Sequence, residues 1–139
     1  ALAAHSPEDE HDCFSDNTHF SHFYNGKGIR NVYLGEYQQV NGETLTGPSL
    51  SDLVAANQPA ADSQLKTDLN ASEAALQVLV DSANNGTYFD QLIAPGNAQG
   101  ADTVNAAIDA LVVQTTSIEK AARVLNIQAL NPDTANHSF

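Results

Sequence analysis

The stretch PAADSQLKTDLNASEAALQVLVDSAN, residues 59–84, carries the pattern that decides the fold. Small and apolar residues recur in it at alternating intervals of four and three, which is typical of the buried seam of a helix in a bundle. The seam residues are Leu65, Leu69, Ser72, Leu76, Leu79 and Ala83. Pro59 suits the first turn of a helix, and Asn85-Gly86 suits its end. The pattern predicts one long helix over residues 59–84.

A second long helix is predicted further along the chain, over residues 98–127. It follows a short apolar element at residues 88–93 and a break at Pro95-Gly96. Its apolar residues again repeat like a heptad, which indicates a second bundle helix. The expected seam is Val104, Ile108, Leu111, Thr115, Ile118, Ala122 and Leu125, widened by Val112 and Val113.

The N-terminal part of the chain predicts a helix over residues 7–24. Ser6 can cap this helix, Pro7 suits its first position, and Asn25-Gly26 suits its end. A short helix is then expected over residues 27–35, with a strand as the alternative.

Residues 36–47 predict a hairpin, because two short runs of strand-forming residues flank Asn41-Gly42. Helical structure restarts at Pro48-Ser49, where Ser49 and Asp52 have the spacing of a capping box. The tail, NPDTANHSF, is expected to be irregular. The chain therefore predicts a single all-α domain over residues 1–139, an antiparallel helical bundle with a small β-hairpin insertion.

The charge of the chain excludes some classes of partner. Seventeen acidic residues against five lysines and arginines give a formal net charge of −12. This charge disfavours binding to a nucleic-acid backbone or to an anionic membrane surface. The sequence has no apolar run long enough to span a bilayer. Cys13 is the single cysteine, so it forms no internal disulfide, and we expect it to be a buried, inert thiol.

Histidines and acidic residues cluster between residues 6 and 24. On the predicted helix they share an arc of roughly 100°. These residues are Glu8, His11, Asp12, Ser15, His19 and His22. Imidazole and carboxylate groups one turn apart can bind one metal ion, and iron or zinc would suit such ligands. The alternative is a set of hydrogen-bonded histidines that line a domain interface.

Motifs for other chemistry are missing. The sequence holds no His-Glu-x-x-His motif of a zinc peptidase and no glycine-rich phosphate loop. Arg30 is one of few fixed cations, and it could orient a carboxylate or hold an anionic ligand. The alternative is a salt bridge between the first helix and the short helix after it.

Several motifs resemble the C-terminal half of imelysin-like proteins, the family of the insulin-cleaving membrane protease and of iron-regulated protein A. The motifs are EDEHDCFSDNTH (8–19), GIRNVYLGEY (28–37), GPSLSDLV (47–54), FDQLIAPGN (89–97) and LNPD (130–133). The resemblance implies a two-lobed, all-helical fold with a site in the cleft between the lobes. It also implies an exported protein of iron uptake, in the periplasm or at the outer-membrane surface of a Gram-negative bacterium.

The resemblance also suggests which residues bind. By motif, His11 and His19 are the expected metal ligands, and Ser15, Asp16 and Arg30 are expected to bind a further ligand. The ion would be divalent or ferric, with iron or zinc as candidates. The family's Gly-x-His-x-x-Glu signature belongs to the N-terminal half and is absent from this sequence, so that half is the expected partner. The chain looks like a fragment or a cleaved chain.

Three hypotheses follow from the sequence. The first is a metal- or ligand-binding module whose first helix lines the shared cleft. The second is half of a metallopeptidase that is active only with its partner half, since the family has been classed among the metallopeptidases. The third is a purely structural bundle.

Overall fold

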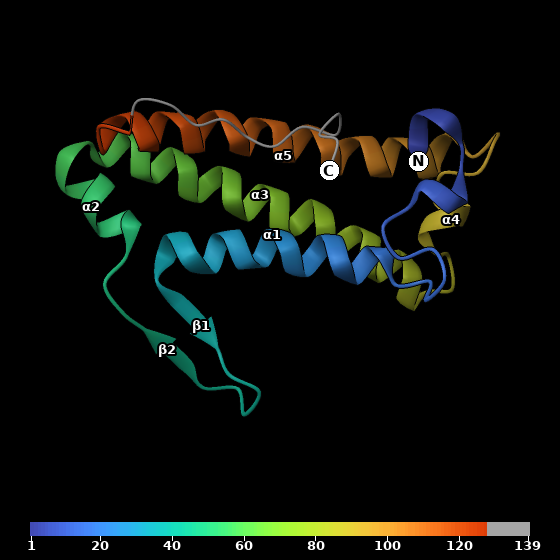
Figure 1. The fold of residues 1–139 in the computed structure, drawn as a ribbon, viewed down its shortest axis with the longest axis horizontal. Coiled ribbons are helices and arrows are strands. Elements are labelled where there is room, and N and C mark those ends of the chain that lie inside the picture. The colour runs from blue at the N-terminus through green and yellow to red at the C-terminus, as the bar shows by residue number, and fades with distance from the viewer. Residues whose placement is uncertain (128–139) are drawn as a thin grey trace, which may run out of the picture.

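Three long helices dominate the computed structural model, which describes residues 1–127. They are α1 (Thr18–Leu34), α3 (Pro59–Asn84) and α5 (Ala98–Val124), and they lie along the longest axis of the molecule (Figure 1). Shorter elements complete the fold: 3₁₀ turns at Leu2–Ala4 and Pro7–Asp9, α2 (Leu50–Asn57), α4 (Phe89–Leu92) and the strands β1 (Glu36–Gln38) and β2 (Thr44–Thr46). The prediction of an all-α bundle with a small β-hairpin is confirmed. The predicted irregular tail lies outside the described residues.

Helix α3 lies at the centre of the bundle. It runs antiparallel to both α1 and α5, and both helices pack along it, whereas α1 and α5 make much less contact with each other (Figure 1). All the predicted seam residues of α3 are buried: Leu65, Leu69, Ser72, Leu76, Leu79 and Ala83. Because one helix serves two neighbours, its apolar seam holds the whole bundle together.

The buried side of α5 differs from the predicted seam. Ile108, Val112 and Val113 are 45%, 61% and 53% exposed. Gln114 and Ser117 are buried instead, because α3 offers them polar partners. Ser72 donates a hydrogen bond to Gln114, and the Ser117 hydroxyl donates to the Asp68 carboxylate at 2.5 Å. These bonds satisfy buried polar groups and leave apolar side chains of α5 at the surface.

The predicted helix over residues 7–24 is wrong. Pro7–Asp9 forms a single 3₁₀ turn, residues 10–17 follow a series of turns, and α1 begins only at Thr18. The helix then continues through Asn25-Gly26, so the expected short element at 27–35 is its second half.

Gly26 is a packing residue and not a helix stop. A Cβ atom at Gly26 would lie 2.6 Å from the Leu76 Cδ1 atom, so the glycine allows α1 to approach α3 closely. The helix ends at Gly35, whose φ of 63° is the left-handed conformation of a helix C-terminus.

The hairpin and the following helix match their predictions. β1 and β2 pair antiparallel, with Tyr37 opposite Leu45, and they project away from the bundle (Figure 1). At the start of α2, the Asp52 N–H donates to the Ser49 hydroxyl at 3.0 Å, and the Asp52 carboxylate accepts from the Ser49 N–H at 3.2 Å. This is the predicted capping box.

Asp62 joins three helices at one end of the bundle. Its carboxylate accepts hydrogen bonds from Tyr33 of α1 at 2.9 Å, from Ser51 of α2 at 2.6 Å and from Lys66 of α3 at 2.8 Å. Burial alone would raise the pKa of Asp62, but the bonds from Lys66, Ser51 and Tyr33 hold it below its usual range. The ionised carboxylate is therefore the stable form in the folded protein.

Gly28→Ala tests the continuity of α1. A Cβ atom at Gly28 would meet nothing within 4 Å, so alanine fits. In a helix interior this change raises the free energy of unfolding by about 1 kcal/mol. We expect a rise of that size in urea denaturation. Unchanged or lower stability would contradict a helix that continues through residue 28.

Asp62→Asn tests the carboxylate that joins the helices. An amide cannot accept all three hydrogen bonds, so we expect a loss of roughly 2 kcal/mol at neutral pH. Because the pKa of Asp62 is lowered on folding, its stabilisation exists above the unfolded value of about 4 and is lost as pH falls through the folded value. The wild-type protein should therefore lose its advantage in acid unfolding. The control is Asp81→Asn, on the exposed side of α3, which should change stability little.

Candidate functional site

Residues 1–17 lie at the end of the bundle where α1 begins and α4 lies (Figure 1). The His5 ring is hydrogen-bonded through Nδ1 to the carbonyl oxygen of Ile93 at 2.7 Å. Further along, the Asp12 N–H donates to the hydroxyl of Thr18 at 3.0 Å, and Ser21 donates to the Asp12 carboxylate. The segment therefore folds back onto the first turns of α1.

This fold-back pairs His11 with His22. Their ring centroids lie 5.8 Å apart. On one continuous helix the same residues would be roughly 16 Å apart, since each residue adds about 1.5 Å. The prediction that the six residues share one face of a single helix is therefore wrong. Two of them, His11 and His22, nevertheless lie close together because the chain folds back.

His19 lies in a different environment. It is 4% exposed, and its ring centroid lies 4.6 Å from that of Phe20 and 6.0 Å from that of Tyr88. Its Nδ1 atom is buried and has no hydrogen-bond partner among residues 1–127. The two expected metal ligands, His11 and His19, therefore have different neighbours. The His11 ring lies beside His22, and the His19 ring lies beside Phe20 and Tyr88.

Glu10 is a second buried group with an unsatisfied atom. The residue is 8% exposed, and its Oε2 atom has no hydrogen-bond partner in the described part of the chain. Burial raises the pKa of the Glu10 carboxyl, a hydrogen bond with Thr18 opposes the rise, and the charges of Asp90, Asp16 and Asp12 add to it. A buried carboxylate among like charges is costly unless a cation or a donor reaches it.

Glu10, His11 and His22 line one cavity of about 350 Å³. The rest of its lining is largely apolar and includes Leu76 and Phe89. Burial lowers the pKa of His22, and the charge of His11 lowers it further. The cavity therefore combines two imidazoles and two acidic residues, Asp9 and Glu10, with an apolar wall. Nevertheless, no three His, Cys, Asp or Glu side chains within residues 1–127 are arranged to hold a metal ion.

The other expected ligand-binding residues are spread out. Ser15 and Asp16 are exposed in the turns before α1, and Asp16 has a φ of 53°. Arg30 lies further along α1, where it pairs with Glu73 of α3 at 3.1 Å and with Glu36 at 3.7 Å. The salt-bridge alternative for Arg30 is thus the observed contact, although its main partner is on α3.

Cys13 is only partly buried, contrary to expectation. Burial and the nearby charges of Glu10 and Glu8 raise the pKa of its thiol, which disfavours the reactive thiolate.

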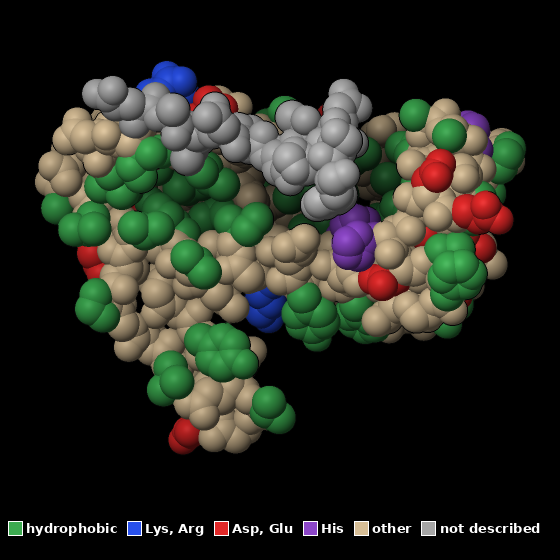
Figure 2. All heavy atoms as spheres, in the orientation of Figure 1, with side chains coloured by type: hydrophobic (Ala, Val, Ile, Leu, Met, Phe, Trp, Pro, Cys, Tyr) green, Lys and Arg blue, Asp and Glu red, His purple; other side chains and the backbone are tan. Residues whose placement is uncertain are grey.

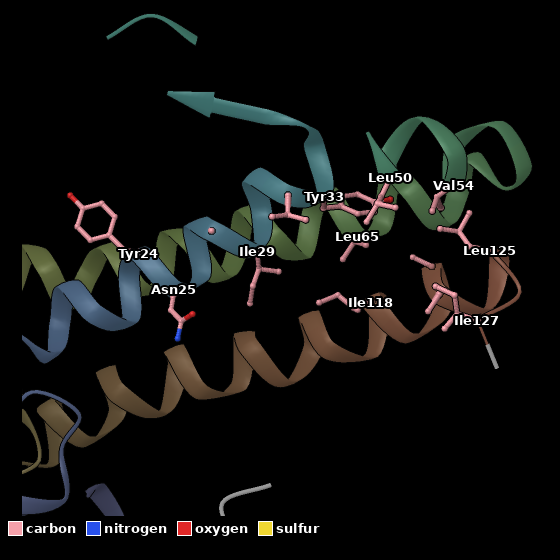
Figure 3. A pocket seen from close by; sticks show the side chains of 14 residues that line it. Tyr24, Asn25, Ile29, Tyr33, Leu50, Val54, Leu65, Ile118, Leu125 and Ile127 are labelled. Atoms are coloured by element: carbon pink, nitrogen blue, oxygen red, sulfur yellow. The ribbon is translucent and has the colours of Figure 1, made fainter. Parts of the chain in front are cut away.

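A larger apolar groove of about 610 Å³ runs between α1 and α5. Figure 3 shows Ile29 of α1 and Ile118 of α5 reaching into the space between these helices, with Leu65 of α3 at its floor. In Figure 2 hydrophobic side chains line a hollow between the two helices. None of the helices within residues 1–127 is long and apolar enough to cross a membrane.

Glu10→Gln tests whether the buried carboxylate is a cost to folding. Its raised pKa means that stability falls as pH rises from the ordinary value of 4.5 through the folded value. Glutamine avoids this penalty, so we expect the variant to be more stable by about 1 kcal/mol at pH 7 in urea denaturation, with the gain vanishing below pH 4.5.

The control is Glu8→Gln, because Glu8 is exposed, and it should shift stability by less than about 0.5 kcal/mol. A Glu10→Gln protein that is less stable at neutral pH would contradict the account.

Comparison with known proteins connects these features to a family. No curated protein matches the chain. The family model of imelysin, peptidase family M75, matches residues 1–118, which include the whole histidine-containing segment and most of the bundle. The chain therefore belongs to the imelysin family.

Proposed function

We propose that this chain forms one wall of a metal- or ligand-binding cleft in an exported bacterial protein of iron uptake. A second helical unit, the N-terminal half with the Gly-x-His-x-x-Glu motif, supplies the other wall. The observation that carries the proposal is a pair of buried atoms, Glu10 Oε2 and His19 Nδ1, in the same short segment, with no hydrogen-bond partner among residues 1–127. Membership of the imelysin family supports the part of the proposal that concerns export and iron.

Unpartnered buried polar groups need a physical reason. Each costs roughly 1–3 kcal/mol of stability, so native proteins have few of them. Here two such groups lie in the segment from Glu10 to His19, and a cavity opens beside Glu10. A bound ion, or a donor from a second unit, would satisfy them. The incomplete set of ligands in the described residues also suits a site shared between two walls.

The apolar groove between α1 and α5 supports the proposal that a second helical unit packs on this chain. Ile29 and Val32 line it on α1, where they are 42% and 70% exposed. Leu50 of α2 lines it too and is 44% exposed. Clusters of exposed apolar side chains are typical of interaction surfaces, and helices pack most readily on other helices.

The acidic character of the chain suits a cationic ligand. The formal charge is −12, and six acidic residues lie between Glu8 and Asp16 or pack near them: Glu8, Asp9, Glu10, Asp12, Asp16 and Asp90. A field of this sign raises the local concentration of metal cations and repels anions.

Val32→Glu tests the shared cleft. The chain and the second unit should co-elute in gel filtration, and a buried glutamate in the groove should weaken this association by roughly tenfold or more. The matched control is Val78→Glu, because Val78 is 50% exposed on α3 and does not line the groove.

Iron titration of the same samples tests the site itself. We expect Fe²⁺ or Fe³⁺ to bind more tightly to the assembled pair than to the chain alone, and His19→Phe to remove that gain. Equal iron affinity with and without the second unit, or association that is indifferent to Val32→Glu, would contradict the proposal.

A further inference from the structure

We infer that His11 and His22 form a two-imidazole site for a first-row divalent ion such as Zn²⁺, Ni²⁺ or Cu²⁺. This inference builds on the proposed function, since it assigns ligands within the proposed binding wall. It differs from the sequence prediction, which named His19 as the second ligand.

The spacing of the two rings suits a shared ion. Metal–nitrogen bonds of about 2.1 Å place the centroids of two ligating imidazoles roughly 5–6.5 Å apart. The observed separation is 5.8 Å, and the ring planes are tilted by 43°. This separation is therefore compatible with one ion bound by a nitrogen of each ring.

Hydrogen bonds next to both histidines hold the pair in place. Asp12 follows His11 in the sequence, and Ser21 precedes His22. The Ser21 hydroxyl donates to the Asp12 carboxylate, and the Asp12 N–H donates to the Thr18 hydroxyl at 3.0 Å. This clasp fixes the turn that carries His11 against the helix that carries His22. A ligand pair that is preorganised in this way loses less entropy when an ion binds.

The surroundings leave room for further ligands. His11 is exposed, and the cavity that both rings line holds the Glu10 carboxylate. The His22 ring also packs beside Phe89, with centroids 5.8 Å apart. Water or a group from another molecule would complete the coordination, as at metal sites with open positions. Imidazole ligands favour copper, nickel and zinc over magnesium and calcium.

The test is calorimetric titration of the chain alone with Zn²⁺, Ni²⁺ and Mg²⁺. We expect Zn²⁺ and Ni²⁺ to bind and Mg²⁺ not to bind. His22→Phe keeps an aromatic ring beside Phe89 but removes the ligand, and we expect it to weaken Zn²⁺ binding by roughly tenfold or more. His11→Ala, at an exposed position, should have the same effect without a loss of folding, which circular dichroism would verify.

A histidine outside the pair makes the result specific. His5→Asn, at a left-handed position that asparagine tolerates, should leave Zn²⁺ affinity unchanged. Ser21→Ala should weaken Zn²⁺ binding although it removes no ligand, because it removes the hydrogen bond from Ser21 to the Asp12 carboxylate. Absence of Zn²⁺ binding, or binding that persists in the His22→Phe protein, would overturn the inference. Since no second unit is present, either result leaves the test of the shared cleft independent.

Discussion

The bundle depends on the burial of one seam of α3 against two helices at once. Leu65 and Leu69 pack in a cluster with Tyr33 of α1 and Ala121 of α5, and Leu76 and Leu79 pack in a second cluster with Phe23 and Val104. Because α1 and α5 make little contact with each other, removing either one would expose α3. The same arrangement leaves the groove between α1 and α5 open. The packing that stabilises the fold therefore also leaves apolar side chains accessible in this groove.

The segment before α1 gains its form from that bundle. Asp12 is held by Thr18 and Ser21, and this contact returns the chain to the helix start and places His11 beside His22. Glu10 and His19 become buried in the process, and each keeps one polar atom without a hydrogen-bond partner in the described part of the chain. Stability lost at such groups is a common consequence of sites that are formed for a ligand and not for packing alone. A purely structural bundle offers neither atom a partner within residues 1–127.

Much of the fold could be predicted because local and long-range signals agree. The seam of α3, the Asn-Gly hairpin and the Ser49–Asp52 capping box each have one dominant pattern. The predicted start of the first helix was wrong because Ser6-Pro7 begins only a 3₁₀ turn. The run Ser15-Asp16-Asn17-Thr18 favours turns and helix caps over a helix interior, so α1 begins only at Thr18. The pairing of His11 with His22 has no periodic signal at all, since it results from a reversal of the chain. Likewise, the buried side of α5 depends on polar partners on α3.

Before Thr18 the chain folds back and brings His11 against His22. The most direct measurement is a nuclear Overhauser effect between the ring protons of these two histidines in the folded chain. Ring centroids 5.8 Å apart predict a clear cross-peak. A helix that continues from Pro7 would separate the rings by roughly 16 Å and give none. Absence of the cross-peak in the folded protein would contradict the fold-back and the site that rests on it.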